Sequence, residues 1–339
     1  MRFTTSGFGK SVLAALLGSA MFLSCVAQAQ VTARLGHSFT EDHPRGKAMK
    51  KFAADLEKAT AGKIKVRILG GSMLGSEQQM LQATQSGAQE FYLGAVSPIS
   101  GRIIEMNIFD FPFLFANDEE AFKVLDGQFG RKMLDDLAPL NLQGLTWSGG
   151  AFRSIANNKR AVHSLADLKG LKIRVMQTKV AIESFKALGM NPVPMSYSEV
   201  YTALETGALD GHEHPLVDMY QNKMFEVEKF LTLSNHVYTP VALIVSKKWF
   251  NSLPADQQAA IRKVAEQTRD YERQEELRQE RDAVAQLKSA GMTVTELSAA
   301  DRDRIRTLVK PVIDANAKAI GADFVKSFYD EVEKVRAKP

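Results

Sequence analysis

The stretch KIKVRI at residues 63–68 alternates polar and apolar side chains with a period of two, which predicts a half-buried β-strand. The residues before it predict a helix over Pro44 to Thr60, because proline suits the first turn of a helix and Phe52 and Leu56 fall on one face. Before that helix, residues 31–36 have the composition of a short strand. The order of elements is therefore strand, helix, strand.

The alternation continues beyond residue 68. Glycines at positions 70, 71 and 75 interrupt the chain, and a helix is then predicted over residues 76–86 and an apolar strand over residues 91–96. This alternation of strands and helices is typical of an α/β fold, in which helices cover a mainly parallel sheet.

The same pattern resumes past the middle of the chain. Strands are predicted at residues 144–147, 152–156, 171–175 and 241–246, and helices at residues 179–188 and 198–206. No Gly/Ser-rich or Pro-rich connector separates this second α/β unit from the first. Two units that are joined by strands suit two lobes that hinge about a cleft.

Residues 254–289 form the most helical segment of the sequence, with no glycine and no internal proline. At 1.5 Å per residue this helix would be about 54 Å long, which exceeds the width of one lobe and predicts a helix that lies across both. Its middle, Arg269 to Arg281, is densely charged. We interpret that charge as a solvated helix face with i,i+4 pairs, in preference to a partner site.

The first thirty residues have the pattern of a secretory signal peptide. Arg2 and Lys10 give a basic start, an apolar run follows over residues 11–26, and AQA at residues 27–29 has the small side chains that signal peptidase accepts. The run is too short to span a membrane, so we expect cleavage after residue 29 and export to the periplasm. The alternatives are a retained N-terminal helix and, because an imperfect lipobox precedes Cys25, a lipid anchor.

Cysteine use and charge narrow the class of protein. Cys25 is the single cysteine, so cleavage would leave a mature chain without disulfides. The formal net charge is +4 over 339 residues, with no concentrated basic stripe of the kind that binds nucleic acid. The length allows about two domains of ordinary size.

Local catalytic signatures are absent from the sequence. It contains no glycine-rich dinucleotide or phosphate motif, and WSGG at residues 147–150 fails as a nucleophile elbow because Thr146 replaces the first glycine. Without a cysteine in the mature chain, thiol catalysis is excluded. We expect a protein that is not an enzyme and uses no cofactor; a periplasmic enzyme is the alternative.

The triplet His212-Glu213-His214 has two interpretations. On an extended segment its two imidazoles lie on one face, where His37 and His43 could complete a metal site. Zinc sites use three or four protein ligands, however, and single histidines in a hydrogen-bonded cleft are the commoner outcome. We therefore expect no metal.

Two arginines interrupt apolar strands and are the most informative residues. Arg174 lies within LKIRVM at residues 171–176, and Arg153 follows Phe152 in another strand. Such an arginine reaches solvent, pairs with a buried acid, or faces a ligand anion. A guanidinium can hold a carboxylate by two parallel hydrogen bonds, so two of them near a cleft would form an acid-binding site.

Three nearly contiguous segments resemble a known family: LKGLKIRV at residues 168–175, PMSYSEVYTALETG at 194–207 and LDGHEHP at 209–215. They are similar to the signatures of TRAP-transporter solute-binding proteins of the DctP type (tripartite ATP-independent periplasmic). Asn235-His236 and WFNSLP at residues 249–254 also match the family pattern. The resemblance covers essentially the whole mature chain.

The resemblance implies a two-lobe periplasmic-binding-protein architecture with hinge strands and a long helix that spans both lobes. After a signal peptide at residues 1–29, lobe I would comprise residues 31–150 and about 240–279, and lobe II residues 151–239 and about 280–335. It also implies closure on an organic acid in the periplasm, and we expect the protein to be a monomer. The acid would pass to the small and large TRAP membrane subunits, which an ion gradient powers.

The resemblance also implies roles for individual residues. Arg174 falls on the main carboxylate-binding arginine, Arg153 on a second arginine of the cleft, and Tyr197 on the aromatic of the following signature. His214 stands where the family often has asparagine, which leaves the ligand class open. His37 and Glu77 stand where residues of the first lobe often face the ligand.

The expected ligand is a small organic acid. Histidines and Glu77 offer many hydrogen bonds, which favours a hydroxylated monoacid such as a sugar acid. The alternative is a C4-dicarboxylate whose second carboxylate is held by Arg153. A metal carrier or signalling receptor on the same fold is an alternative from another class.

Overall fold

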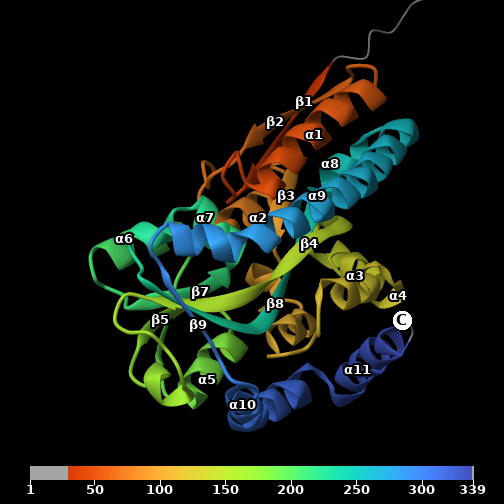
Figure 1. The fold of residues 1–339 in the computed structure, drawn as a ribbon. Helices are drawn as coiled ribbons and strands as arrows, with labels where there is room; N and C mark the ends of the chain where they lie inside the picture. Colours follow the sequence, from red (N-terminus) through yellow and green to blue (C-terminus); the bar gives the residue numbers. More distant parts are fainter. Residues whose placement is uncertain (1–29, 338–339) are drawn as a thin grey trace, which may run out of the picture.

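The computed structural model describes residues 30–337 (Figure 1). The predicted signal peptide, its cleavage site and Cys25 lie outside these residues. The strands are β1 (Val31–His37), β2 (Ile64–Leu69), β3 (Phe91–Ala95), β4 (Leu142–Asn157), β5 (Lys172–Val175), β6 (Asn191–Pro194), β7 (Gly211–Pro215), β8 (Phe230–Ser246) and β9 (Thr293–Glu296).

The α-helices are α1 (Pro44–Ala59), α2 (Glu77–Ser86), α3 (Asp118–Asp126), α4 (Gln128–Asp135), α5 (Lys179–Ala187), α6 (Val200–Glu205), α7 (Leu216–Gln221), α8 (Lys247–Ser252), α9 (Ala255–Ser289), α10 (Ala299–Ile320) and α11 (Ala322–Arg336). Short 3-10 helices are η1 (Ser97–Ile99), η2 (Ile104–Asp110), η3 (Ala138–Leu140), η4 (Leu165–Leu168), η5 (Tyr197–Glu199) and η6 (Met224–Glu226). None of the helices in residues 30–337 combines the length and apolar character that a membrane span requires.

The elements of the first α/β unit are confirmed, and local signals explain their ends. Helix α1 begins with Pro44, and the side chain of His43 accepts a hydrogen bond from the backbone N–H of Arg45. Helix α2 begins with a capping box in which Ser76 and Gln79 satisfy each other's backbone N–H groups, and it ends at Gly87 in the left-handed conformation.

The strands form one continuous mixed sheet in the order β2-β1-β3-β8-β4-β7-β5-β6, with β9 beside β8. Parallel pairs join β1 to β2 and β3 at one end, and β5 to β6 and β7 at the other. Antiparallel pairs of β8 with β3, β4 with β8 and β4 with β7 join the two ends. The predicted mainly parallel sheet therefore holds at each end and is wrong at the centre.

The centre was mispredicted because β4 and β8 are single long strands. The sequence predicted two short strands at residues 144–147 and 152–156, whereas β4 is continuous over 16 residues and carries bulges. Gly149 and Gly150 do not break it; they allow close packing. A Cβ on Gly149 would lie 3.1 Å from Oε1 of Glu272, and one on Gly150 would lie 2.5 Å from the ring of Tyr238.

Helix α9 runs across both halves of the molecule, as predicted. The first half contains the end of the sheet formed by β1, β2 and β3, and the second half contains the end formed by β5, β6 and β7. It packs on α1, on β4 and on α7, and Figure 1 shows it passing from alongside α1 toward α7. On the side of the first half, Phe52, Phe91 and Ile261 share one buried apolar cluster. In the second half, Ile173 and Phe185 belong to another. Burial of each large apolar side chain stabilises the fold by about 1.5–3 kcal/mol.

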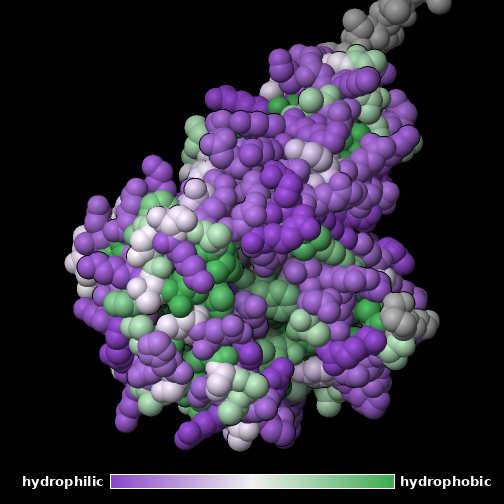
Figure 2. Space-filling model, in the orientation of Figure 1, coloured by the Kyte–Doolittle hydropathy of each residue, from purple (hydrophilic) through white to green (hydrophobic). Residues whose placement is uncertain are grey.

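The interpretation of Arg269 to Arg281 as a solvated face is wrong for three residues. Glu272, Arg273 and Glu276 are buried where α9 crosses β4. The other residues of this segment are exposed or half-buried, in agreement with a solvated face, and the view in Figure 2 is mostly hydrophilic over α1 and α9. The buried charges lie on the opposite side, against Arg45 and the backbone of β4.

The C-terminal helices contact both halves: α10 packs on α5, and α11 packs on α3. Buried side chains of α11, such as Phe328, belong to the same apolar cluster as Trp147 of β4. The exact division of the chain into two lobes stays a prediction.

Gly211, at the start of β7, offers a test of how closely this strand is packed. A Cβ at this position would lie 2.1 Å from the carbonyl oxygen of Ala156 in β4. Gly211→Ala should therefore lower the free energy of unfolding by about 1–3 kcal/mol, measured by urea denaturation. Gly101→Ala is the control, because a Cβ there meets nothing within 4 Å. Equal midpoints for the two variants would contradict the close packing.

Candidate functional site

A cavity of about 280 Å³ lies between the two halves of the sheet. The residues that line it come from both halves and from β8: Ser38, Phe39, Arg45, Glu77, Gln78, Ala95, Ser97, Pro98, Ser100, Gly101, Arg153, Arg174, Met176, Gln177, Ser196, Tyr197, His214, Pro215, Asp218, Thr239 and Val241. The polar side chains of this lining include charged, hydroxyl and amide groups. Five of the six predicted site residues are among them, and His37 is not.

Arg174 projects from β5 into this lining and is 5% exposed. Its Nε and Nη2 atoms donate hydrogen bonds to the carbonyl oxygen of Met195, at 2.9 and 2.8 Å. Its Nη1 atom is buried without a hydrogen-bond partner, and no carboxylate within the described part of the chain forms an ion pair with it. Burial, followed by the charge of Arg153, lowers the pKa of Arg174 to about 10, so it is protonated at neutral pH.

Arg153 lines the same cavity, but its charge is balanced. Its Nε pairs with Oε2 of Glu213, and its Nη2 donates to Oε1 of the same residue at 2.8 Å. Nη1 has only a long contact of 3.5 Å, with the hydroxyl of Thr239. An arginine in an apolar strand was expected to reach solvent, pair with a buried acid or face a ligand anion; Arg153 pairs with a buried acid.

Tyr197 and His214 form one wall of the cavity. Their rings stack with centroids 4.1 Å apart and planes inclined by 7°. Nη2 of Arg153 lies 3.2 Å from Nδ1 of His214, and because a guanidinium can only donate, Nδ1 must accept. Burial and the charge of Arg153 lower the pKa of His214 to about 3, so the ring is neutral and carries its proton on Nε2, 3.7 Å from Oδ1 of Asp218.

The two residues predicted from the first half differ in position. Glu77, at the start of α2, lines the cavity and accepts a hydrogen bond of 2.9 Å from Ser38, and burial raises its pKa. His37 is almost completely buried and does not line the cavity; its imidazole centroid lies 5.9 Å from that of the ring of Phe39, which does line it. Burial lowers the pKa of His37 to about 4, and neither ring nitrogen has a hydrogen-bond partner.

Sequence reasoning missed a buried ion network on the cavity wall. Arg45 of α1 lies 3.5 Å from Asp218 of α7, 3.3 Å from Glu272 and 3.2 Å from Glu276 of α9. All four side chains are almost completely buried. One guanidinium therefore serves three carboxylates, and it links the first half, the second half and the long helix.

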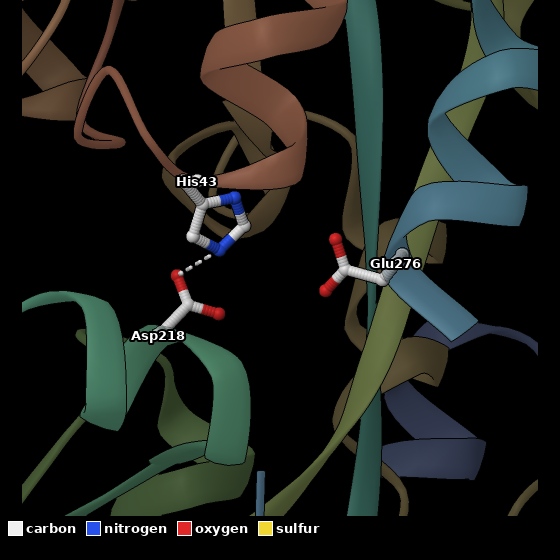
Figure 3. Close-up of side chains that lie close together, drawn as sticks. All are labelled: His43, Asp218 and Glu276. Atoms are coloured by element: carbon white, nitrogen blue, oxygen red, sulfur yellow. Dashed lines mark ion pairs between the residues drawn. The ribbon is translucent and has the colours of Figure 1, made fainter. Parts of the chain in front are cut away.

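The residues His43, Asp218 and Glu276 also offer one ligand atom each within 4.8 Å of one another, and Figure 3 shows the three side chains converging. Arg45 already supplies positive charge to both of these carboxylates. The residues of the alternative metal site considered from the sequence, His212-Glu213-His214, have other partners: His212 lies 2.8 Å from Glu228, and Glu213 pairs with Arg153.

The raised pKa of Glu276 predicts a pH-dependent stability. Burial raises this pKa from 4.5 to about 7, so between these values the folded state holds a proton that the unfolded state has released. The stability that this proton contributes is present at pH 5 and is lost as the pH rises through 7. Relative to the unsubstituted protein, Glu276→Gln should gain about 1–3 kcal/mol in free energy of unfolding between pH 5 and pH 8, measured in urea. Glu266→Gln, exposed on the same helix, should show no such gain; parallel curves for both variants would refute the assignment.

Comparison with known proteins gives consistent matches over nearly the whole chain. The model of "Bacterial extracellular solute-binding protein, family 7" matches residues 35–319. The 2,3-diketo-L-gulonate-binding periplasmic protein of Escherichia coli K12 is 33% identical over 322 residues, covering 94% of this chain and 97% of the relative. The C4-dicarboxylate-binding periplasmic protein of Rhodobacter capsulatus is 33% identical over 324 residues, covering 93% and 96%.

Among solved structures, the sugar acid binding protein of Advenella mimigardefordensis in complex with galactonate superposes with a TM-score of 0.88 at 39% identity. The match covers 91% of this chain and 99% of that one. The shared architecture confirms the predicted α/β fold with two lobes.

Proposed function

The chain belongs to the bacterial extracellular solute-binding proteins of family 7, and from this premise we propose that it captures a hydroxylated monocarboxylate, a sugar acid of the aldonate or uronate class. The family is one of solute-binding proteins for transport rather than a class of enzymes, and solved relatives are complexes with galactonate and with D-glucuronate. The proposal concerns which carboxylate this cavity suits and which residues hold it.

The observation that carries the proposal is the state of Arg174. It is a buried, protonated guanidinium on a cavity wall, without an acidic partner among residues 30–337 and with Nη1 free of hydrogen bonds. A buried charge of this kind is stabilised by a bound anion, and a carboxylate fits a guanidinium in geometry and charge. Arg174 is therefore the anchor for the ligand's carboxylate.

The charge balance of the lining supports one carboxylate rather than two. The C4-dicarboxylate alternative needs Arg153 for a second carboxylate, but Glu213 already neutralises Arg153. Arg45 is likewise occupied by three acids. Besides Glu77, His214 and Asp218, the remaining polar side chains carry hydroxyl or amide groups, which suit the hydroxyl groups of a sugar acid: Ser38, Gln78, Ser97, Ser100, Gln177, Ser196, Tyr197 and Thr239.

Similarity alone does not choose between these ligands. The relative that binds diketogulonate and the relative that binds C4-dicarboxylates are equally identical to this chain, at 33%. The galactonate complex, at 39% identity, agrees with the choice that the charge balance favours.

The cavity also supplies a reason for closure. Arg174 and Tyr197 lie in the second half, whereas Ser38 and Glu77 lie in the first, and all four line the cavity. A ligand that contacts both sets binds the closed form more tightly than the open one, and this difference in affinity drives closure. We propose that the closed form then delivers the acid to the TRAP membrane subunits, after export of the chain and cleavage behind residue 29.

The test is identification of the ligand. Mass spectrometry of the protein purified without refolding should detect a retained sugar acid. Calorimetry should give tight binding of galactonate, with succinate weaker by at least about 100-fold because its second carboxylate finds no unpaired cation. Equal or tighter binding of succinate would refute the monocarboxylate class, and turnover of the bound acid would refute a role in transport alone.

A further inference from the structure

The wall of the cavity that contains Arg174 has an acid at its other end. Cζ of Arg174 lies 5.8 Å from the ring centroid of Tyr197, Tyr197 stacks on His214 at 4.1 Å, and Nε2 of His214 lies 3.7 Å from Oδ1 of Asp218. Arg174 and Asp218 both line the cavity and form no ion pair with each other. Two stacked rings therefore separate a cationic end of the wall from an anionic end.

Asp218 is buried and retains an acceptor that no protein group satisfies. Its side chain is 2% exposed, and its Oδ2 atom has no hydrogen-bond partner. The nearest cation, Nη1 of Arg45, lies 3.5 Å from Oδ2 and is shared with Glu272 and Glu276. Burial alone would raise the pKa of Asp218, but His43 and His214 lower it well below its usual range, so the carboxylate stays ionised.

We propose that Asp218 is a specificity-determining residue: it accepts a hydrogen bond from a hydroxyl group at the end of the ligand remote from Arg174, and it repels a second carboxylate there. The inference rests on the proposed function, because it takes Arg174 as the anchor of the first carboxylate. An ionised carboxylate can only accept hydrogen bonds, so it suits a hydroxyl and opposes another anion. The cavity thereby selects aldonates over the corresponding aldarates, which carry a carboxylate at both ends.

Three six-carbon probes of nearly equal size separate these contributions. D-galactonate has a terminal hydroxyl, galactarate has a second carboxylate in its place, and 6-deoxy-D-galactonate has neither. In calorimetry on the whole mature protein, galactonate should bind at least about 100-fold more tightly than galactarate and about tenfold more tightly than the deoxy acid. Galactarate has the same constitution from either end, so no reversed orientation can avoid the contact.

The substitution Asp218→Asn removes the charge and keeps the size. It should shrink the ratio of galactonate to galactarate affinity by at least about tenfold, because the amide can donate a hydrogen bond to the second carboxylate. It should also reduce the ratio of galactonate affinity to 6-deoxy-D-galactonate affinity. Asp126→Asn is the matched control: Asp126 also pairs with an arginine, Arg273, but lies outside the cavity lining, so the ratios should be unchanged.

The outcomes separate this inference from the proposed function. Equal affinity of the unsubstituted protein for galactonate and galactarate overturns the inference alone, even where Asp218→Asn does not fold. An unchanged ratio in a folded Asp218→Asn variant, with circular dichroism matching the parent, overturns it as well. Binding of none of the three probes overturns this inference, and the absence of binding to D-galacturonate as well overturns the proposed function.

Discussion

Arg174→Ala is expected to weaken sugar-acid binding by at least about 100-fold, measured by calorimetry on the mature chain. The physical reason is the desolvated carboxylate that would remain in the cavity without its guanidinium. The two hydrogen bonds to the carbonyl oxygen of Met195 fix the side chain, so Nη1 is preorganised for binding the carboxylate of the ligand. The free protein should remain folded, because removing a cation that has no acidic partner leaves no opposite charge unpaired.

Two further variants make that expectation specific. Arg174→Lys should recover only part of the affinity, since an ammonium group cannot offer two parallel hydrogen bonds. Arg67→Ala, exposed on β2, should bind like the unsubstituted protein. If Arg174→Ala binds within a few-fold of the parent, Arg174 is not the anchor.

The second large effect is on stability. Arg45→Met should lower the free energy of unfolding at pH 8 by about 3–5 kcal/mol, because it leaves the carboxylates of Asp218, Glu272 and Glu276 buried without their shared cation. The measurement is urea unfolding at fixed ionic strength. Lys50→Met is the control on the same helix, since Lys50 is about half exposed and its pair with Glu41 is a surface pair.

The loss caused by Arg45→Met should depend on pH. Burial raises the pKa values of Glu272 and Glu276 to about 7 even with Arg45 present, and removal of the cation raises them further. At pH 5 both carboxyls can take up protons and the destabilisation should fall, whereas at pH 8 it is complete. A loss that is equal at both pH values would show that packing rather than charge accounts for the effect.

Sequence patterns predicted the first α/β unit and the long helix because their signals are local. The alternation at residues 63–68 and the glycine-free run of residues 254–289 depend only on near neighbours along the chain. Strand β4 was divided in error because Gly149 and Gly150 resemble a break, whereas their lack of side chains is explained by contacts with residues about 90 to 120 positions away.

The site divides in the same way. The resemblance to the family predicted five ligand-binding residues that do line the cavity: Arg174, Arg153, Tyr197, His214 and Glu77. It gave no information on which of their charges are balanced by a neighbouring group. Arg45 was missed because it interrupts no apolar run. Asp218 does stand within an apolar run, LVDMY at residues 216–220, but its pairing with Arg45 crosses from α1 to α7, which no local pattern reveals. His37 was wrongly expected at the cavity: Phe39, two residues later, lines it, whereas His37 is buried beside that ring and does not.

The continuous sheet has a consequence for any attempt to divide this protein. Strands β4 and β8 pair along almost their whole length at the centre of the sheet. The part of the sheet in each half therefore depends on hydrogen bonds to the same two strands. A fragment cut between them would present a long row of unsatisfied amide and carbonyl groups, the surface on which chains assemble into aggregates. The lobes are therefore not interchangeable modules: a chimaera that swaps one lobe for a relative's must carry both central strands from a single parent.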